Sequence, residues 1–332
     1  MATHMWEILL ASVALAALMG FAIQRGATCT VAAVDELMNQ RRAQRLLSLA
    51  EAALWVGLGL LLLRQLGVMA PLPAGHEPGW RTVLGGVLLG GGAYVNRACV
   101  FGAIARWSNG EWAYVATPIG FFAGCWLFLR VFQSMAAPAS LQMAPALALP
   151  AWATALALVL LVLRVAYGVH VSWLRLLADP HLHTPSQRGR GLLMSVWRPA
   201  PATIVIGLTF LGMMLMAGPW AYTELLSEWA AGMARQTWVR ALLAAALFGG
   251  AALGGWLAGR WAWRSGRIVH AKDIVRCLIG GALMGMGSQF IPGGNDGLIL
   301  VGMPLLWAYA WLAFGTMCLT ISGLMACQKL TQ

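Results

Sequence analysis

Long apolar runs alternate with short polar connections along most of the chain. The runs cover residues 6–24, 47–66, 82–96, 112–132, 149–169, 201–217, 237–258, 274–291 and 301–326. Each approaches the roughly 20 residues that an α-helix needs to cross a bilayer. We therefore predict an all-α, polytopic membrane protein, with about nine transmembrane helices in a single transmembrane domain over 1–332.

Four places in this pattern combine a long helix, a break and a short amphipathic segment. They are "QRGATCTVAAVDEL" (24–37), "VNRACVFGAIARW" (95–107), "MAGPWAYTELLSEW" (216–229) and "SQFIPGGNDGLIL" (288–300). Backbone that leaves helical geometry inside a bilayer must be satisfied by protein or must line a water-filled cavity. We therefore expect the four breaks to converge on one lined centre. Short broken or re-entrant helices should begin there, at Cys29, Cys99, Trp220 and Asn295, and Asn295 or Asp296 should cap the last of them.

Composition agrees with a membrane location. Hydrophobic residues make up 60% of the 332 residues and charged residues only 10%. A soluble protein of this size would need more polar surface. The first apolar run begins near Met5 and its basic residues, Arg25 and Arg41, follow it, so we do not expect a removable signal peptide.

The net charge of +11 is unevenly distributed among the connections. Basic residues gather in three connections and at the end of the chain: Arg41, Arg42 and Arg45; Arg175, Arg188, Arg190 and Arg198; Arg260, Arg264, Arg267 and Lys272; and Lys329. Residues 69–80 and 133–150 contain no Lys or Arg. In a membrane protein such asymmetry reports orientation, so we expect no nucleic-acid partner. Nine crossings then put the N-terminus outside and the C-terminus in the cytoplasm.

An odd number of crossings allows one helix to divide two halves of opposite orientation. The predicted parts are a first half-repeat over 1–133, a dividing helix over 149–170, a cytoplasmic loop over 171–199 and an inverted second half-repeat over 200–332. Glycines support this division, because Gly85, Gly86, Gly90 and Gly92 match Gly280, Gly281, Gly285 and Gly287 when Gly85 is laid on Gly280. Inverted repeats with broken helices that meet at mid-membrane are typical of transporters.

The expected centre favours an anion. Short helices that begin there would direct their N-terminal amides and positive dipole ends inward. Arg25 and Arg97 precede two of the breaks, and an ionisable residue near membrane depth is a functional candidate. The alternative is that both arginines extend to the interface.

Glycine-rich stretches at three of the breaks resemble those of a known family. "GFAIQRGATC" ends at Cys29, "GGVLLGGGAYVNRACVFG" contains Cys99, and "GGALMGMGSQFIPGGNDG" looks like a later signature. From about Gly20 to Cys318 the chain resembles the YeeE/YedE sulfur-transport family. The resemblance implies a nine-helix hourglass with inverted halves. It also implies uptake of thiosulfate or a related sulfur species past cysteines at a constriction, with Cys29 and Cys99 matching two of them.

One position departs from the family pattern. The later signature usually ends Gly-Gly-Cys-Asn-x-Gly, whereas this chain reads "PGGNDG", with Gly294 in place of the third cysteine. Either the ligand needs only two thiols together with Asn295 and Asp296, or this chain carries another anion. A carboxylate near the route of an anion is repulsive unless it is capped, paired or protonated.

Cysteine suits a transport path for chemical reasons. A thiol is a soft, weak donor, and conduction needs weak, multiple binding sites. A transient persulfide at Cys99 would require thiolate character, so reversible contact is the favoured reading. The other four cysteines, Cys125, Cys277, Cys318 and Cys327, are expected to be small buried hydrophobes.

The sequence predicts no cofactor, no metal site and no catalytic residues. "GGVLLGGG" lacks the Lys-Ser/Thr ending of a phosphate loop and is better explained by helix packing. His170, His181 and His183 are expected in a solvated connection rather than at a metal. Glu51 is the main acid inside a predicted span.

These observations predict an inner-membrane transporter that imports thiosulfate or a similar small sulfur-containing anion, and not an enzyme. The alternatives are a passive anion channel, a transporter of a selenium-containing or non-sulfur anion, and a structural membrane subunit. The family resemblance adds a candidate partner, a separate cytoplasmic sulfur-relay protein that accepts the delivered sulfur.

Overall fold

The computed structural model describes residues 2–68, 72–132, 140–141, 144–178, 196–233, 237–260 and 269–331. Nine helices of 16 or more residues lie within these ranges. They are α1 (Ala2–Gly26), α3 (Gln44–Gln65), α4 (Trp80–Asn96), α6 (Ala116–Val131), α7 (Ala151–Ala178), α9 (Pro199–Ala217), α11 (Thr237–Leu257), α12 (Ala271–Phe290) and α14 (Ala308–Leu330).

Short helices follow four of the long ones. These are α2 (Thr30–Gln40), α5 (Val100–Ser108), α10 (Tyr222–Ala230) and α13 (Asn295–Gly297), which a π-helical turn, η3 (Leu298–Gly302), continues. Two 3-10 turns, η1 (Trp112–Val115) and η2 (Pro145–Ala148), and a two-residue antiparallel pair, β1 (Gly75–His76) with β2 (Ser140–Leu141), complete the described elements. The last apolar run was predicted to form a helix from residue 301, but residues 301–307 belong to the break and α14 begins at Ala308.

The prediction of a polytopic, all-α membrane protein is confirmed. Within the described ranges, seven helical segments are long and apolar enough to cross a membrane, and the bent pair formed by α12 with α13 and η3 makes an eighth. The described side chains of α7 add a shorter apolar stretch, Ala151–Arg164. Large apolar side chains such as Trp152, Leu163 and Leu319 are exposed on the outer surface, where a bilayer would cover them.

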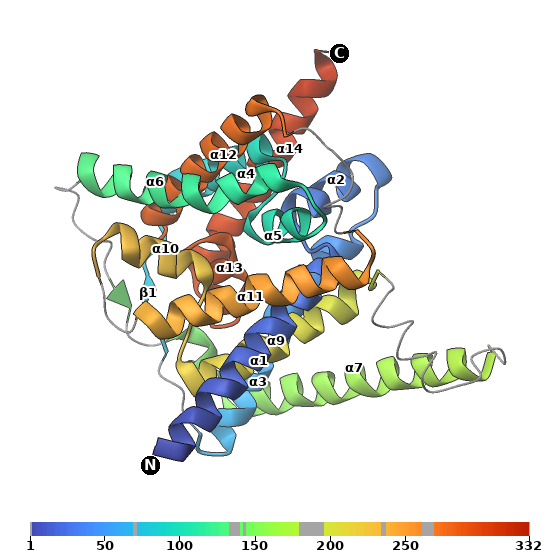
Figure 1. Ribbon diagram of the computed structural model, residues 1–332. Helices are drawn as coiled ribbons and strands as arrows, with labels where there is room; N and C mark the ends of the chain where they lie inside the picture. Colours follow the sequence, from blue (N-terminus) through green and yellow to red (C-terminus); the bar gives the residue numbers. More distant parts are fainter. Residues whose placement is uncertain are drawn as a thin grey trace.

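The long helices form two groups of four, with the short helices between them (Figure 1). One group consists of α1, α3, α9 and α11, and the other of α4, α6, α12 and α14. Helix α2 contacts α3 in the first group and α14 in the second, and α10 contacts α11 and α6. Each group therefore contains two helices from each half of the chain, and the broken helices are held at the seam between the groups.

The two halves repeat the same order of elements, which is long, short, long, long, short, long. Their contacts repeat as well: α1 packs on α11 as α9 packs on α3, and α12 packs on α6 as α4 packs on α14. Helices α4 and α12 occupy matching places and run antiparallel, because Gly85 lies against Gly287 and Gly92 lies against Gly280. This is the relation that an inverted repeat predicts.

Glycine makes this packing possible. A Cβ at Gly92 would lie 2.6 Å from the backbone oxygen of Gly280, and a Cβ at Gly287 would lie 2.7 Å from that of Gly85. Such separations are shorter than a side chain tolerates, so only glycine lets the two backbones approach this closely. Small residues at helix interfaces are the usual means of association in a bilayer, where apolar surface alone gives no driving force.

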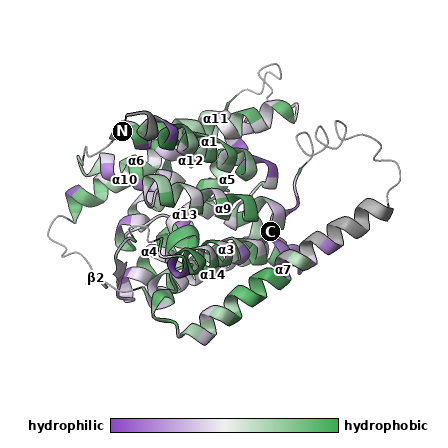
Figure 2. Cartoon of the chain, turned by 90° about the horizontal axis from the view of Figure 1, so that it is seen from below, coloured by the Kyte–Doolittle hydropathy of each residue, from purple (hydrophilic) through white to green (hydrophobic). Residues whose placement is uncertain are grey.

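Helix α7 separates the two halves in the sequence but not in space. It lies at the edge of the molecule and contacts α3, with an ion pair of 2.7 Å between Arg164 and Glu51 (Figure 2). The helix also continues to Ala178, so the connection predicted over 171–199 begins later than expected. Residues 179–195, which include His181, His183, Arg188 and Arg190, lie outside the described residues, as do Arg264 and Arg267.

Candidate functional site

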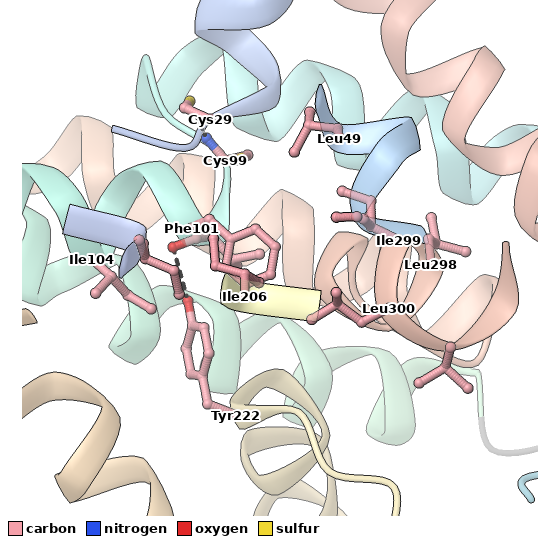
Figure 3. Packing of buried hydrophobic residues seen from close by; sticks show 14 of the residues in the cluster. Cys29, Leu49, Cys99, Phe101, Ile104, Ile206, Tyr222, Leu298, Ile299 and Leu300 are labelled. Carbon is pink, nitrogen blue, oxygen red and sulfur yellow. Dashed lines mark hydrogen bonds between the residues drawn. The ribbon is translucent and has the colours of Figure 1, made fainter. Parts of the chain in front are cut away.

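Cys29 and Cys99 lie against each other at the N-termini of two short helices (Figure 3). Cys29 is the N-cap residue of α2 and Cys99 that of α5, and both side chains are buried. The backbone N–H of Cys99 points to the sulfur of Cys29 at 3.5 Å, and that of Thr30 donates to the sulfur of Cys99 at 3.2 Å. Each thiol therefore faces the positive end of a helix that belongs to the other break.

Local sequence explains why the chain breaks at these positions. Helix α4 ends as Arg97 adopts a left-handed conformation with φ of 60°, which reverses the chain before α5 begins. Gly102 lies one turn into α5, where an added Cβ would stand 2.5 Å from the sulfur of Cys29. A glycine at this position leaves room for the Cys29 thiol.

The equivalent positions of the second half carry no thiols. Ala221 is the N-cap residue of α10 and Gly294 that of α13. Helix α10 thus begins at Tyr222 rather than at Trp220. The expectation that Asn295 or Asp296 caps the last short helix is wrong, because both residues are already inside it and Gly294 has no side chain to accept a hydrogen bond.

Two polar contacts join the short helices of the two halves, and a third joins the two short helices of the second half. Asn295 donates from its side-chain amide to the hydroxyl of Thr30 at 3.5 Å, and the Tyr222 hydroxyl donates to the backbone oxygen of Val100 at 3.4 Å. Within the second half, the Thr223 hydroxyl donates to the Asp296 carboxylate at 2.5 Å. Together with the contact between the two cysteines, these bonds link the beginnings of α2, α5, α10 and α13 into one buried centre.

Oxygen atoms fill the space beside Gly294. A Cβ at this position would lie 2.5 Å from the Thr223 hydroxyl and 2.6 Å from the Asp296 carboxylate. A cysteine could therefore stand here only if Thr223 and Asp296 moved. The replacement of a thiol by glycine is thus accompanied by a hydroxyl and a carboxylate in the adjacent space.

Two hollows approach this centre. One, of about 720 Å³, is lined by Cys29 and Gly102 together with the ends of α4 and α14. The other, of about 550 Å³, is lined by Thr223, Glu224 and Gly294 together with the ends of α6 and α12. The first hollow thus reaches the Cys29 thiol, and the second reaches Gly294, the position in the other half that corresponds to Cys99.

The hollows differ in charge. The hollow at Cys29 is lined by five basic side chains and one acidic one, which are Arg45, Arg97, Arg106, Arg276, Lys329 and Asp35. The hollow at Gly294 is lined by two basic and two acidic side chains, which are Arg81, Arg240, Glu224 and Glu228. In the first hollow Arg45, Arg106 and Arg276 form ion pairs with Glu36, Glu111 and Asp273. Basic side chains still outnumber acidic ones in its lining, and an excess of one sign of charge favours the opposite sign in a cleft.

The two arginines named from the sequence have different surroundings. Arg97 is exposed and lines the hollow at Cys29. Arg25 is buried, and its guanidinium lies 5.0 Å from the centre of the Phe21 ring. Arg25 is not among the residues that line either hollow, and its place on the path stays a prediction from the sequence.

The remaining cysteines also differ from one another. Cys125 and Cys277 are buried in helices, as expected, and Cys125 donates to the backbone oxygen of Gly285 at 3.4 Å. Cys318 is half-buried, and Cys327 is exposed near the end of α14, so the expectation of burial is wrong for Cys327. The last turns of α14 extend past their helical neighbours, which leaves Cys327 uncovered (Figure 1).

The sequence profile of a family described as sulphur transport matches residues 25–322 of the 332. The chain belongs to the sulphur transport family. The predicted membership is therefore confirmed, and the match covers both halves, from the end of α1 to the middle of α14. No curated protein matches the chain.

In this member of the sulphur transport family, three residues of the buried centre were not identified from the sequence. They are Thr30, Tyr222 and Thr223. A clear sign of the repeat was not identified either. The tripeptide "WAY" occurs at 112–114, 220–222 and 307–309, and its first and last copies have the same separation as Cys99 and Gly294. That register pairs Cys99 with Gly294 and Val100 with Asn295, and so indicates which positions of the two halves correspond.

Proposed function

We propose that this member of the sulphur transport family imports thiosulfate, or a similar small sulfur-containing anion, through the constriction at Cys29 and Cys99. The anion would pass from the hollow at Gly294, past Asn295 and the two thiols, into the hollow at Cys29. The supporting observation is the contact between Cys29 and Cys99, at a buried point where four broken helices meet between two hollows.

The chemistry of this centre suits weak, repeated binding. A thiol can donate a modest hydrogen bond to sulfur or oxygen, and the helix N-termini provide amides and a positive field. Neither contact binds as firmly as an arginine would, and a conducting site must release its ligand as readily as it admits it. Arg97 and the other basic side chains of the hollow at Cys29 would attract the anion without holding it at the constriction.

The distribution of basic residues supports an orientation. The hollow at Cys29 is lined by Arg45 and Lys329, which belong to connections expected in the cytoplasm, whereas the hollow at Gly294 adjoins Pro73 from the connection without basic residues. We therefore propose the inner membrane, with the N-terminus outside and the C-terminus inside. A separate sulfur-relay protein would receive the anion on the cytoplasmic side.

Uptake of labelled thiosulfate into liposomes that contain the purified protein tests this function. We expect saturable uptake by the wild type and its loss in Cys29→Ala and Cys99→Ala. Cys277→Ala is the matched control, because Cys277 is as completely buried as Cys99 but lies in α12, away from the centre. It should transport as the wild type does.

Other outcomes would change the proposal. Uptake that rises linearly with concentration would indicate a passive channel. Uptake equal to that of empty liposomes would contradict thiosulfate as the substrate, and the same assay should then be repeated with selenium-containing and other anions. Normal uptake by both cysteine variants would contradict the proposed path.

A further inference from the structure

Asp296 is a buried carboxylate inside the constriction. Its side chain is 1% exposed. One oxygen accepts the Thr223 hydroxyl at 2.5 Å and the backbone N–H of Gly297 at 3.0 Å. The other oxygen, Oδ2, has no hydrogen-bond partner among the described residues. An ionised carboxylate buried in this way, with half of its hydrogen-bonding capacity unused, carries a large desolvation cost.

The groups that face Asp296 do not neutralise it. From α10 it meets Thr223, and it interacts electrostatically with Tyr222 and Glu224 of the same helix. Beyond these groups, Tyr222 interacts with Cys99 of α5 and Glu224 with Tyr309 of α14. Glu224 also feels Glu228 and Arg240, but Arg240 already forms an ion pair with Glu228. Apart from Arg240, the side chains named around Asp296 are thus neutral or acidic, and the positive group that faces it is the backbone N–H of Gly297 at the N-terminus of α13.

The carboxylate also stands on the route proposed for the anion. A Cβ at Gly294 would lie 2.6 Å from Asp296, and both Gly294 and Thr223 line the hollow on this side. Asn295, which follows Gly294 in the chain, donates from its side-chain amide to the hydroxyl of Thr30, and the backbone N–H of Thr30 donates to the sulfur of Cys99. An anion that moves from this hollow to the thiols therefore passes close to Asp296, and two like charges in a site shielded from water repel each other strongly.

We propose that Asp296 is a proton-binding residue of transport, and that the sulfur-containing anion crosses the constriction only while this carboxyl is protonated. A proton from water in the hollow at Gly294 adds to Oδ2, and the carboxylic acid so formed can donate a hydrogen bond to the passing anion. The proton returns to water after the anion has left, and no electron is transferred. The passage of the anion rests on the proposed function, whereas the proton site can be tested without it.

The first test compares uptake of labelled thiosulfate at several values between about pH 5 and about pH 8, with the same pH on both sides of the liposome membrane. Thiosulfate remains a dianion over this range, so its own protonation does not contribute. We expect wild-type uptake to fall as pH rises, by up to about tenfold per pH unit, because the fraction of protonated Asp296 falls by that factor. In Asp296→Asn the ratio of uptake at low and high pH should be close to one.

Glu77→Gln is the matched control, since Glu77 is an exposed carboxyl that lines neither hollow. Its pH ratio should equal that of the wild type. A wild type without pH dependence would overturn the proposal. An Asp296→Asn variant that keeps the wild-type ratio would do the same, and a flat profile in Glu224→Gln alone would assign the proton to Glu224 instead.

The second test reads the proton directly. Infrared difference spectra of the purified protein between low and high pH should show the carbonyl stretch of protonated carboxylic acids, and this band should be weaker in Asp296→Asn, which lacks one of them. A band of equal intensity in the wild type and in Asp296→Asn would overturn the proposal. Because this measurement needs no transport, a protein that shows the weaker band in Asp296→Asn and moves no thiosulfate would contradict the proposed substrate and leave the proton site supported.

Discussion

Helix α4 ends at Asn96, and α5 begins directly after its N-cap residue Cys99. In the second half, α12 ends at Phe290, and α13 begins directly after its N-cap residue Gly294. The two breaks occupy matching places in the repeat, and both face the seam between the helix groups. The first presents a sulfur atom at the N-cap, and the second presents backbone beside the oxygens of Thr223 and Asp296. The repeat therefore preserves a scaffold while the chemistry at its centre differs between the halves.

The same contrast holds for the hollows. Matching elements line both of them, but the one at Cys29 is strongly basic and the one at Gly294 balances two basic with two acidic side chains. Packing positions must be compatible with their partners across the repeat, since Gly85 and Gly92 of α4 lie against Gly287 and Gly280 of α12. Residues that face a hollow are free of that constraint and can diverge.

The largest effect should come from breaking the shared scaffold. We expect Gly92→Leu and Gly287→Leu to be equally damaging, because each places a side chain against the backbone of the opposite helix. Neither variant should yield monodisperse protein in detergent. Gly91→Leu is the control, as a Cβ there meets nothing within 4 Å, and it should purify normally. If only one of the two variants failed to give monodisperse protein, the two glycines would not contribute equally to the stability of the packing between α4 and α12.

A thiol in the second half should be costly. Gly294→Cys would place its Cβ 2.5 Å from the Thr223 hydroxyl, so we expect a destabilisation of about 1–3 kcal/mol, as for other overpacked sites. Thermal melting in detergent measures it, with Gly91→Cys as control. An unchanged melting temperature would show that Thr223 and Asp296 move aside readily. Packing would then not be the reason why the second half has glycine where the first half has cysteine.

Replacing sulfur by oxygen in the first half should weaken transport without unfolding the protein. Cys99→Ser keeps an acceptor for the N–H of Thr30 but exchanges a soft, weakly hydrated group for a hydroxyl. We expect thiosulfate uptake to fall about tenfold, the value of one altered hydrogen bond, with the melting temperature little changed. Wild-type uptake in this variant would mean that the path needs only a polar atom at Cys99.

The smallest effect should come from the rim of the basic hollow. Arg97 is exposed, so Arg97→Gln should raise the KM for thiosulfate about two- to threefold at low ionic strength through loss of local field. Added salt should remove the difference, because exposed charges are screened. Arg25→Gln should not show this salt dependence, since Arg25 does not line the hollow. If the KM of Arg25→Gln for thiosulfate did depend on salt, Arg25 would contribute to the field along the transport path.

Much of the architecture follows from pattern alone. Apolar runs of membrane-spanning length predicted the long helices, and interruptions of these runs followed by short amphipathic segments predicted the four breaks, because backbone geometry and bilayer thickness act locally. The exact first residues of the short helices were less predictable, because several neighbouring residues of a break could serve as the N-cap. The structure places the N-caps at Ala221 and Gly294. The burial of Arg25 and the exposure of Arg97 had no local signal, because both follow from which neighbours pack around them.

The sequence by itself determined the membrane environment, the long helices, the breaks and membership of the sulphur transport family, since hydropathy, helix-breaking residues and motifs are properties of short segments. Only the tertiary structure decided that Cys29 and Cys99 touch, that Thr223 and Asp296 fill the space beside Gly294, and that α7 lies outside the bundle. These facts depend on contacts between residues far apart in the chain, and such contacts are fixed when glycine-lined helices pack and bring distant breaks to one seam.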